Sequence, residues 1–230
     1  MVTPLWAQAP STAAAAPRSG SGSTPFARGE SLNYSVSWPS GLSLGEAQFK
    51  TTGGEPGWQF EFTLDAGLPG FEIRDRYRSS AGAQFCSEKL EKDAVHGSRK
   101  TRETVVFDPQ KRVAERQTAG GGKSEVSIGE CAKDALTFLY FLRRELANGR
   151  VPPAQAVIFG GPYQVTATYV DSPQIEVSGQ RQASDRVRVS LRGLASSHSF
   201  EIFFARDAGR APLLVRVPFS LGTFSLELVR

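Results

Sequence analysis

Histidine, cysteine and methionine are all scarce in this chain of 230 residues, which has two histidines, two cysteines and one methionine. The histidines, His96 and His198, lie far apart in the sequence, and the two cysteines do not have the spacing of zinc ligands. We therefore expect no metal site and no cofactor.

Long apolar runs are missing as well. No uninterrupted stretch approaches the roughly 18 apolar residues that indicate a transmembrane helix, so we expect no transmembrane segment. The charge is only mildly one-sided, because 27 Lys and Arg face 23 Asp and Glu, for a formal net charge of +4. This small positive net charge favours anionic binding partners, but it does not predict a fold.

The two cysteines, Cys86 and Cys131, have three interpretations. They form one disulfide in an oxidising compartment, or they are two independent buried thiols, or Cys131 is a nucleophile at the start of a helix. The last needs a histidine, and neither histidine stands in a recognisable catalytic context. We predict the disulfide, which would close a loop of about 45 residues and stabilise the fold by about 4 kcal/mol.

Residues 1–28 differ in composition from the rest of the chain. They are rich in Ala, Ser, Gly and Pro and are predicted to be disordered. Ala7-Gln8-Ala9 has the form of a signal-peptidase site, although the basic and long apolar segments of a signal peptide do not precede it. We interpret 1–28 as a leader remnant or linker, with chance occurrence as the alternative, and 29–230 as a single β domain.

Strand signals dominate that domain. Leu32, Tyr34 and Val36 alternate with polar residues, which is the pattern of a half-buried strand. Segments of this kind, separated by Gly, Pro and Asp turns, follow at 44–51, 58–64, 71–79, 84–90, 101–107, 113–118, 124–128, 156–159, 163–169, 175–177, 186–191, 199–204, 213–217 and 223–229.

The period changes to that of a helix at about 132–148. A stripe of apolar residues with i, i+3, i+4 spacing predicts a buried helix with wet ends: Ala135, Phe138, Leu139, Leu142 and Leu146. Asp134 near its start and Arg143 and Arg144 near its end match the helix dipole, and Asn148-Gly149 can cap it. We predict a mainly β fold whose curved antiparallel sheet forms an incomplete barrel or open sandwich around this helix.

Three segments resemble known catalytic or phosphate-binding motifs, but none has all the residues that its motif requires. Asp65-Ala66-Gly67 and Asp207-Ala208-Gly209 have alanine where the aspartic-protease motif carries a hydroxyl residue, and Asp-x-Gly is common in turns. Gly120-Gly121-Gly122-Lys123-Ser124 lacks the earlier glycine and the following helix of a phosphate-binding loop. We expect no catalytic residues.

Basic residues recur on predicted strands. The candidates for an anion-binding surface are Arg74, Arg76, Arg78, Arg186, Arg188 and Arg192. Carboxylates such as Asp75, Glu103 and Asp185 interrupt the basic runs, so a solvated strand face that protects a sheet edge is favoured over such a surface, and no nucleic acid is expected. The candidates for an apolar ligand site, or for a filled core, are Phe60, Phe62, Phe138, Leu139, Leu142 and Phe204.

Four segments carry a family resemblance: GESLNYSVSWPSGLSLGEAQFK at 29–50, VVFDP at 105–109, DALTFLYFLRREL at 134–146 and RDAGRAPLLVRVPFSLGTFSLEL at 206–228. Together they resemble domain-of-unknown-function family 3108, a bacterial and largely exported family. The resemblance implies a periplasmic or cell-envelope β protein and names no activity. The two cysteines are not part of that family's pattern.

For function, the favoured hypothesis is an exported, non-enzymatic envelope protein that binds a lipid or other apolar ligand, because many Phe and Leu side chains point into a curved sheet. The alternative is a protein-interaction or assembly factor that uses a strand edge or the basic residues, and a hydrolase ranks third. A lined apolar cavity would favour the first hypothesis, and a solid interior would count against it.

Overall fold

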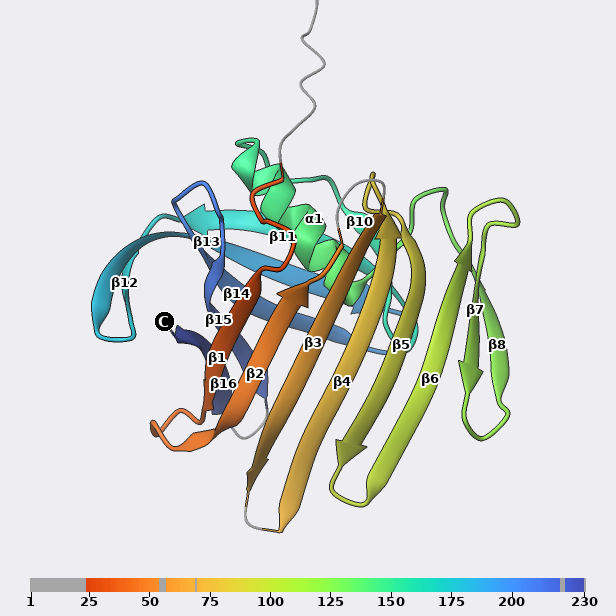
Figure 1. Cartoon of the computed structure of the whole chain (residues 1–230), viewed down its shortest axis with the longest axis horizontal. Helices are drawn as coiled ribbons and strands as arrows, with labels where there is room; N and C mark the ends of the chain where they lie inside the picture. The colour runs from red at the N-terminus through yellow and green to blue at the C-terminus, as the bar shows by residue number, and fades with distance from the viewer. Residues whose placement is uncertain (1–23, 54–56, 69, 220–221, 230) are drawn as a thin grey trace, which may run out of the picture.

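The described residues form a 16-stranded sheet. This sheet curves around helix α1 (Ala135–Ala147), as Figure 1 shows. The strands before the helix are β1 (Ser31–Ser37), β2 (Ser43–Thr51), β3 (Gly57–Leu68), β4 (Phe71–Gly82), β5 (Ser87–His96), β6 (Arg99–Asp108), β7 (Val113–Thr118), β8 (Lys123–Ser127) and β9 (Lys133–Asp134). Those after it are β10 (Gln155–Ile158), β11 (Pro162–Asp171), β12 (Gln174–Val177), β13 (Gln180–Gly193), β14 (Ser197–Ala205), β15 (Pro212–Phe219) and β16 (Gly222–Val229).

The structure is a computed structural model and describes residues 24–53, 57–68, 70–219 and 222–229. The sequence-based expectations for residues 1–23, including Ala7-Gln8-Ala9, lie outside the described residues. Phe26, which composition assigned to the segment 1–28, is 4% exposed and packs in the core against Trp58 and Tyr140. None of the helical segments among the described residues is long and apolar enough to cross a membrane.

The strand order explains why the fold is an open barrel. Strands β1 to β8 follow one another as antiparallel neighbours, and β16 pairs with β1, so that the sheet runs from β8 through β1 and β16 to β10. At the far end β9 pairs with β10 in parallel, and the amide of Ser87, on β5, donates to the Ala132 carbonyl at 3.0 Å. The described strands form one continuous curved sheet that does not close, which confirms the predicted open architecture.

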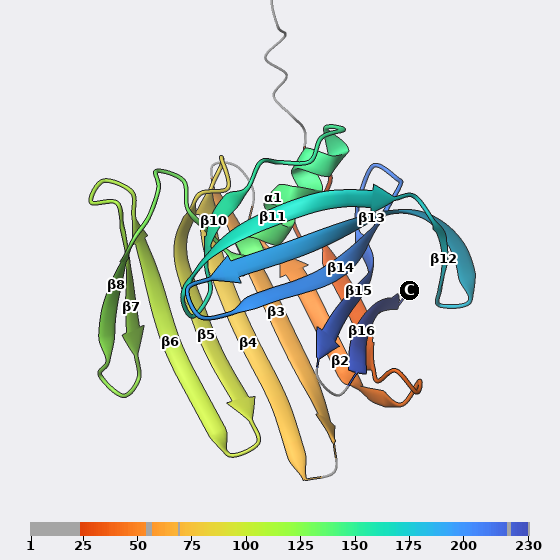
Figure 2. The ribbon, with the colours of Figure 1, turned by 180° about the vertical axis from the view of Figure 1, so that it is seen from behind.

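Helix α1 lies between the two halves of the sheet, as the front and rear views show (Figures 1 and 2). It begins three residues later than predicted because the Asp134 carboxylate caps it by accepting from the amides of Leu136 and Thr137. At its other end Gly149 adopts φ 73°, and the amide of Arg150 donates to the carbonyl of Glu145, which confirms the predicted cap.

The prediction of wet helix ends is confirmed only from Ala147 onward, because Asp134 at the start is 0% exposed and Arg143 near the other end is buried as well. Arg143 was assigned to the wet end, yet its side chain is 1% exposed. Its guanidinium lies 2.6 and 2.9 Å from the two carboxylate oxygens of Glu30, and it donates to the carbonyls of Gly209 and Arg210. The residue is buried because partners from two distant segments satisfy its donors.

Candidate functional site

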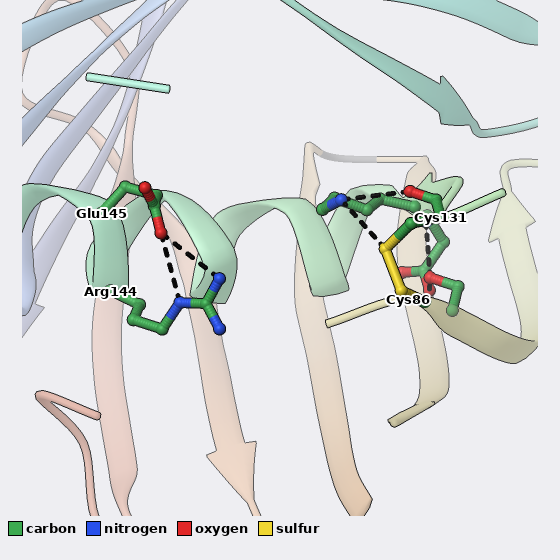
Figure 3. Close-up of a disulfide and its surroundings, with 7 residues drawn as sticks. Cys86, Cys131, Arg144 and Glu145 are labelled. Atoms are coloured by element: carbon green, nitrogen blue, oxygen red, sulfur yellow. Dashed lines mark hydrogen bonds and ion pairs between the residues drawn. A yellow bond between two sulfur atoms is a disulfide. The ribbon is translucent and has the colours of Figure 1, made fainter. Parts of the chain in front are cut away.

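Cys86 and Cys131 form the disulfide that the sequence predicted, with Cα atoms 4.6 Å apart (Figure 3). Cys86 lies in the turn between β4 and β5, and Cys131 lies just before β9. Because both sulfur atoms are bonded to each other, neither is a free thiolate. The interpretations as two independent thiols and as a nucleophilic Cys131 are therefore wrong for this state of the protein.

The six candidate arginines occupy the outer face of two strands in opposite halves of the sheet. On β4, Arg76 pairs with Asp65 at 2.6 Å and Arg78 with Glu61 at 3.3 Å, while Arg74 lies 3.6 Å from Asp65. On β13, Arg186 pairs with Asp171, Arg188 pairs with Glu201, and Arg192 is exposed near the end of the strand. The interleaved carboxylates thus neutralise most of this charge at the surface.

The six apolar candidates lie in or against the core. Phe60, Leu142 and Phe204 are 0% exposed and Phe138 is 7% exposed, whereas Phe62 and Leu139 are partly buried against the same clusters. The Phe60 ring stacks on that of Tyr140 with centroids 4.1 Å apart. These contacts are those of a filled core.

The two Asp-x-Gly segments have separate structural roles. Asp65 lies on β3 and pairs with Arg76 on the outer face. Asp207 closes a turn, where its carboxylate accepts from the amides of Gly209 and Arg210. Gly120 to Gly122 form the tip of the β7–β8 hairpin.

A polar pocket lies on the inner face of the sheet, beside the turn between β10 and β11. It has a volume of about 290 Å³. Its lining residues come from β5, β6 and β7 and from that turn, and they are Lys92, Ala94, His96, Arg99, Thr101, Glu103, Arg116 and Gly160. In Figure 2, β11, β13 and β14 cross in front of β3 and β4, whereas β6 and β7 lie to the left of this crossing.

Strand register explains why charged side chains point inward here. Ser79 on β4 faces the interior, since its hydroxyl donates to the buried Asp134 carboxylate at 2.5 Å. Alternation then places Tyr77 and Asp75 on the same inner face. Directly opposite residues of antiparallel strands share a face, and the ladder pairs Tyr77 with Lys92 and Lys92 with Glu103.

Two buried carboxylates anchor the polar network. Asp75 is 6% exposed and its Oδ1 lies 2.9 Å from His96 Nε2. Glu103 is 3% exposed, and its Oε2 accepts from Arg116 Nε at 2.7 Å. The second oxygen, Glu103 Oε1, is buried and has no hydrogen-bond partner among the described residues. It is therefore a buried acceptor whose hydrogen-bonding capacity is unfilled within the described residues.

Lys92 and Arg99 supply positive charge that no carboxylate neutralises, because neither forms an ion pair with any residue in the described ranges. Lys92 Nζ lies 4.7 Å from the centre of the Phe159 ring and 5.5 Å from that of Tyr77. Burial, reinforced by the Asp75 carboxylate, raises the pKa of the Tyr77 phenol far above its usual range. Tyr77 is therefore neutral at physiological pH.

This arrangement suits binding better than covalent catalysis. Two unneutralised cations can hold an anionic group, and the free oxygen of Glu103 can accept from a hydroxyl or an amine. His96 and Asp75 have the geometry of a base and its orienting carboxylate, and the one hydroxyl among the lining residues is that of Thr101, for which no hydrogen bond to His96 is found among the described residues. No group of metal-ligating side chains occurs within the described part of the chain.

Sequence reasoning missed this pocket, although a signal was present. Charged residues interrupt the apolar alternation at inward positions of three consecutive strands: Asp75 on β4, Lys92 on β5 and Glu103 on β6. Asp75 and Glu103 were read only as breaks in basic runs. Counting back from the hairpin turns would have placed all three on one face.

Comparison with known proteins supports the fold and leaves the chemistry open. No curated protein matches the chain. A crystal structure of a beta-barrel-like protein of domain-of-unknown-function family DUF1849 from Brucella abortus is similar, with a TM-score of 0.61 and 6% identity, over 87% of this chain and 95% of that one. The model of the family described as "Protein of unknown function (DUF3108)" matches residues 33–229. This chain therefore belongs to that family, as its opening strand and central helix motifs predicted.

Proposed function

We propose that this chain is an exported binding protein of the bacterial cell envelope, and that its ligand site is the polar pocket on the inner face of β5 to β7. The ligand is a small anion that also carries hydroxyl groups, such as a uronic acid or a sugar phosphate. The disulfide supports an oxidising compartment, which is where an exported protein resides.

The observation that carries the proposal is Glu103 Oε1. A buried carboxylate oxygen without a hydrogen-bond partner costs about 1–3 kcal/mol, and a ligand hydroxyl would remove that cost. Lys92 and Arg99 flank the same pocket and favour a negative group on the same ligand. Lys92 and Arg99 need a hydrogen-bond acceptor and Glu103 needs a donor, and one small molecule can supply both.

Two alternatives drawn from the sequence have less support. A lipid or other apolar ligand would need open space among the apolar side chains, whereas Phe60, Leu142 and Phe204 fill the core. An assembly factor would use an exposed strand edge such as β8, and β8 carries the exposed charges Lys123 and Glu125, which discourage strand addition.

The test is calorimetric titration of the full chain with glucuronate, galacturonate, glucose 6-phosphate, neutral glucose and a fatty acid. We expect at least one hydroxylated anion to bind and glucose and the fatty acid not to bind. Replacement of the pocket cations, in Lys92→Met and Arg99→Met, should weaken that binding by about tenfold or more each, since each removes a charge-assisted contact.

Glu103→Gln keeps the size of the side chain and should weaken binding while circular dichroism confirms the fold. The matched control is Arg102→Met, on the outer face of β6 and paired with Asp93, which should leave the Kd unchanged. The proposal fails if no hydroxylated anion binds, if the fatty acid binds instead, or if Lys92→Met and Arg99→Met bind like the unmodified chain.

A further inference from the structure

The Cys86–Cys131 disulfide has an unusual neighbour in Lys133. The side chain of Lys133 is nearly fully buried, with 3% of the residue exposed. Its Nζ donates to the Cys131 carbonyl at 3.1 Å and lies 3.6 Å from Cys131 Sγ (Figure 3). It also lies 4.4 Å from the centre of the Phe141 ring.

No carboxylate pairs with this ammonium group among the described residues, because the nearby Glu145 is engaged by Arg144 and Arg150. Burial lowers the pKa of Lys133 to about 8, and Arg144 acts in the same direction while Glu145 opposes it. A buried cation without an anion is costly. Cys131 Sγ lies beside Lys133 Nζ and becomes an anion, a thiolate, when the disulfide opens.

We propose that Cys86–Cys131 is a thiol-exchange site that opens in one direction: an external thiol attacks Cys86, and Cys131 leaves as a thiolate paired with Lys133. Both cysteines are partly exposed, so an external thiol can approach the bond. The site is separate from the polar pocket and does not depend on the function proposed for it.

A thiolate of the external partner forms a new bond to Cys86 Sγ, the Cys86–Cys131 bond breaks, and its electron pair goes to Cys131 Sγ. If the partner is a dithiol, its second thiolate then attacks the mixed disulfide and releases Cys86. The partner loses two electrons and becomes a disulfide, and this chain gains them as two thiols.

The direction follows from the leaving group. A thiolate stabilised by an adjacent cation has a lower pKa and leaves faster than one without such a neighbour. Lys133 contacts Cys131 and not Cys86, so attack at Cys86 is the favoured path.

The experiment incubates the full, oxidised chain with glutathione, blocks free thiols with an alkylating agent and locates the mixed disulfide by peptide mass spectrometry. We expect glutathione on Cys86 and the alkyl group on Cys131. Lys133→Met should slow opening by about tenfold and remove the preference, because the leaving thiolate loses its cation. The matched control Lys89→Met, an exposed lysine on β5 paired with Glu91, should change neither the rate nor the position.

A second measurement covers the case in which Lys133→Met does not fold. In the Cys86→Ser chain, the ultraviolet absorbance of the Cys131 thiolate should titrate below the ordinary cysteine pKa of about 8.5. Glutathione on Cys131, equal modification of both cysteines, resistance of the folded chain to glutathione and dithiothreitol, or a Cys131 thiol with an ordinary pKa would each overturn the proposal.

Discussion

Asp134 shows how much one buried side chain can organise. It is 0% exposed, and its Oδ1 accepts from the first amides of α1. Its Oδ2 accepts from the hydroxyls of Ser79, Ser87 and Thr137 at 2.5–2.9 Å. One carboxylate thus joins β4, β5 and the helix, and the full set of donors compensates for its burial.

Replacement of this residue, in Asp134→Ala, should lower the free energy of unfolding by about 3 kcal/mol or more. The helix loses its cap, worth about 1 kcal/mol, and buried hydroxyls lose their acceptor at about 1–3 kcal/mol. Urea unfolding followed by circular dichroism measures the change. Asp93→Ala, which removes an exposed ion pair with Arg102, is the control and should cost under about 1 kcal/mol. Equal losses in the two variants would contradict the assigned role.

The buried Lys133 makes a contribution to the free energy of unfolding that depends on pH, and replacement of Lys133 should abolish this contribution. Burial lowers the pKa of Lys133 to about 8, against an ordinary value of 10.5. Between these values the unfolded chain binds more protons than the folded chain, so the contribution of Lys133 to the unfolding free energy rises with pH.

Lys133→Met should therefore be more stable than the unmodified chain below pH 8, and the difference should shrink between pH 8 and 10.5. Tyrosines that also titrate in this range are common to both proteins and cancel in the difference. Denaturant unfolding at several pH values measures it, and a difference that is independent of pH would contradict the prediction.

For single residues, the sequence predicted which positions face inward more reliably than it predicted the role of an inward polar residue. Alternation correctly placed Phe60 inside and Arg76 outside. The pocket was missed because its residues come from separate strands and meet only through strand register. The Lys133–Cys131 contact was missed because it depends on the backbone path before the helix.

Among the elements, helix α1 was the best predicted, since its period and its C-terminal glycine are local signals, although Asp134 was expected inside the first turn and is the N-cap. Its relation to the rest of the chain was less accessible. Arg143 looked like a solvent-exposed residue that matches the helix dipole, but its partner Glu30 precedes it by 113 positions. Pairing between residues so far apart produces no periodic pattern in the sequence, so the sequence did not predict it.

The Arg143–Glu30 pair should be important for docking the helix. Arg143→Met leaves the Glu30 carboxylate and two backbone carbonyls without their donor, and should cost about 3–5 kcal/mol of unfolding free energy. Arg78→Met removes the exposed pair with Glu61 and should cost about 0–1 kcal/mol. In a double-mutant cycle with Glu30→Gln, the losses should be non-additive, and additive losses would mean that the pair does not couple the helix to the segment just before β1.

For the whole molecule, two connections hold the halves of the sheet together around the helix. One is the ladder between β1 and β16, a continuous run of paired residues. The other is the region where Cys86 bonds Cys131 and Ser87 donates to Ala132, beside the short parallel pairing of β9 with β10. Both strands of the first were predicted, although their pairing was not, whereas β9 has only two residues and no pattern to predict it.

Loss of the disulfide should therefore loosen the second connection and leave the first intact. In the Cys86→Ser/Cys131→Ser variant, amide hydrogen exchange should accelerate at Ser87, β9 and β10, while the β1–β16 amides keep their protection. The unfolding free energy should also fall by about 4 kcal/mol, because the unfolded chain regains the freedom of a loop of about 45 residues. Reduction of the unmodified chain should reproduce the same local pattern. Uniform acceleration across the sheet, or acceleration centred on β1 and β16, would show that the β9 region does not hold the open barrel together.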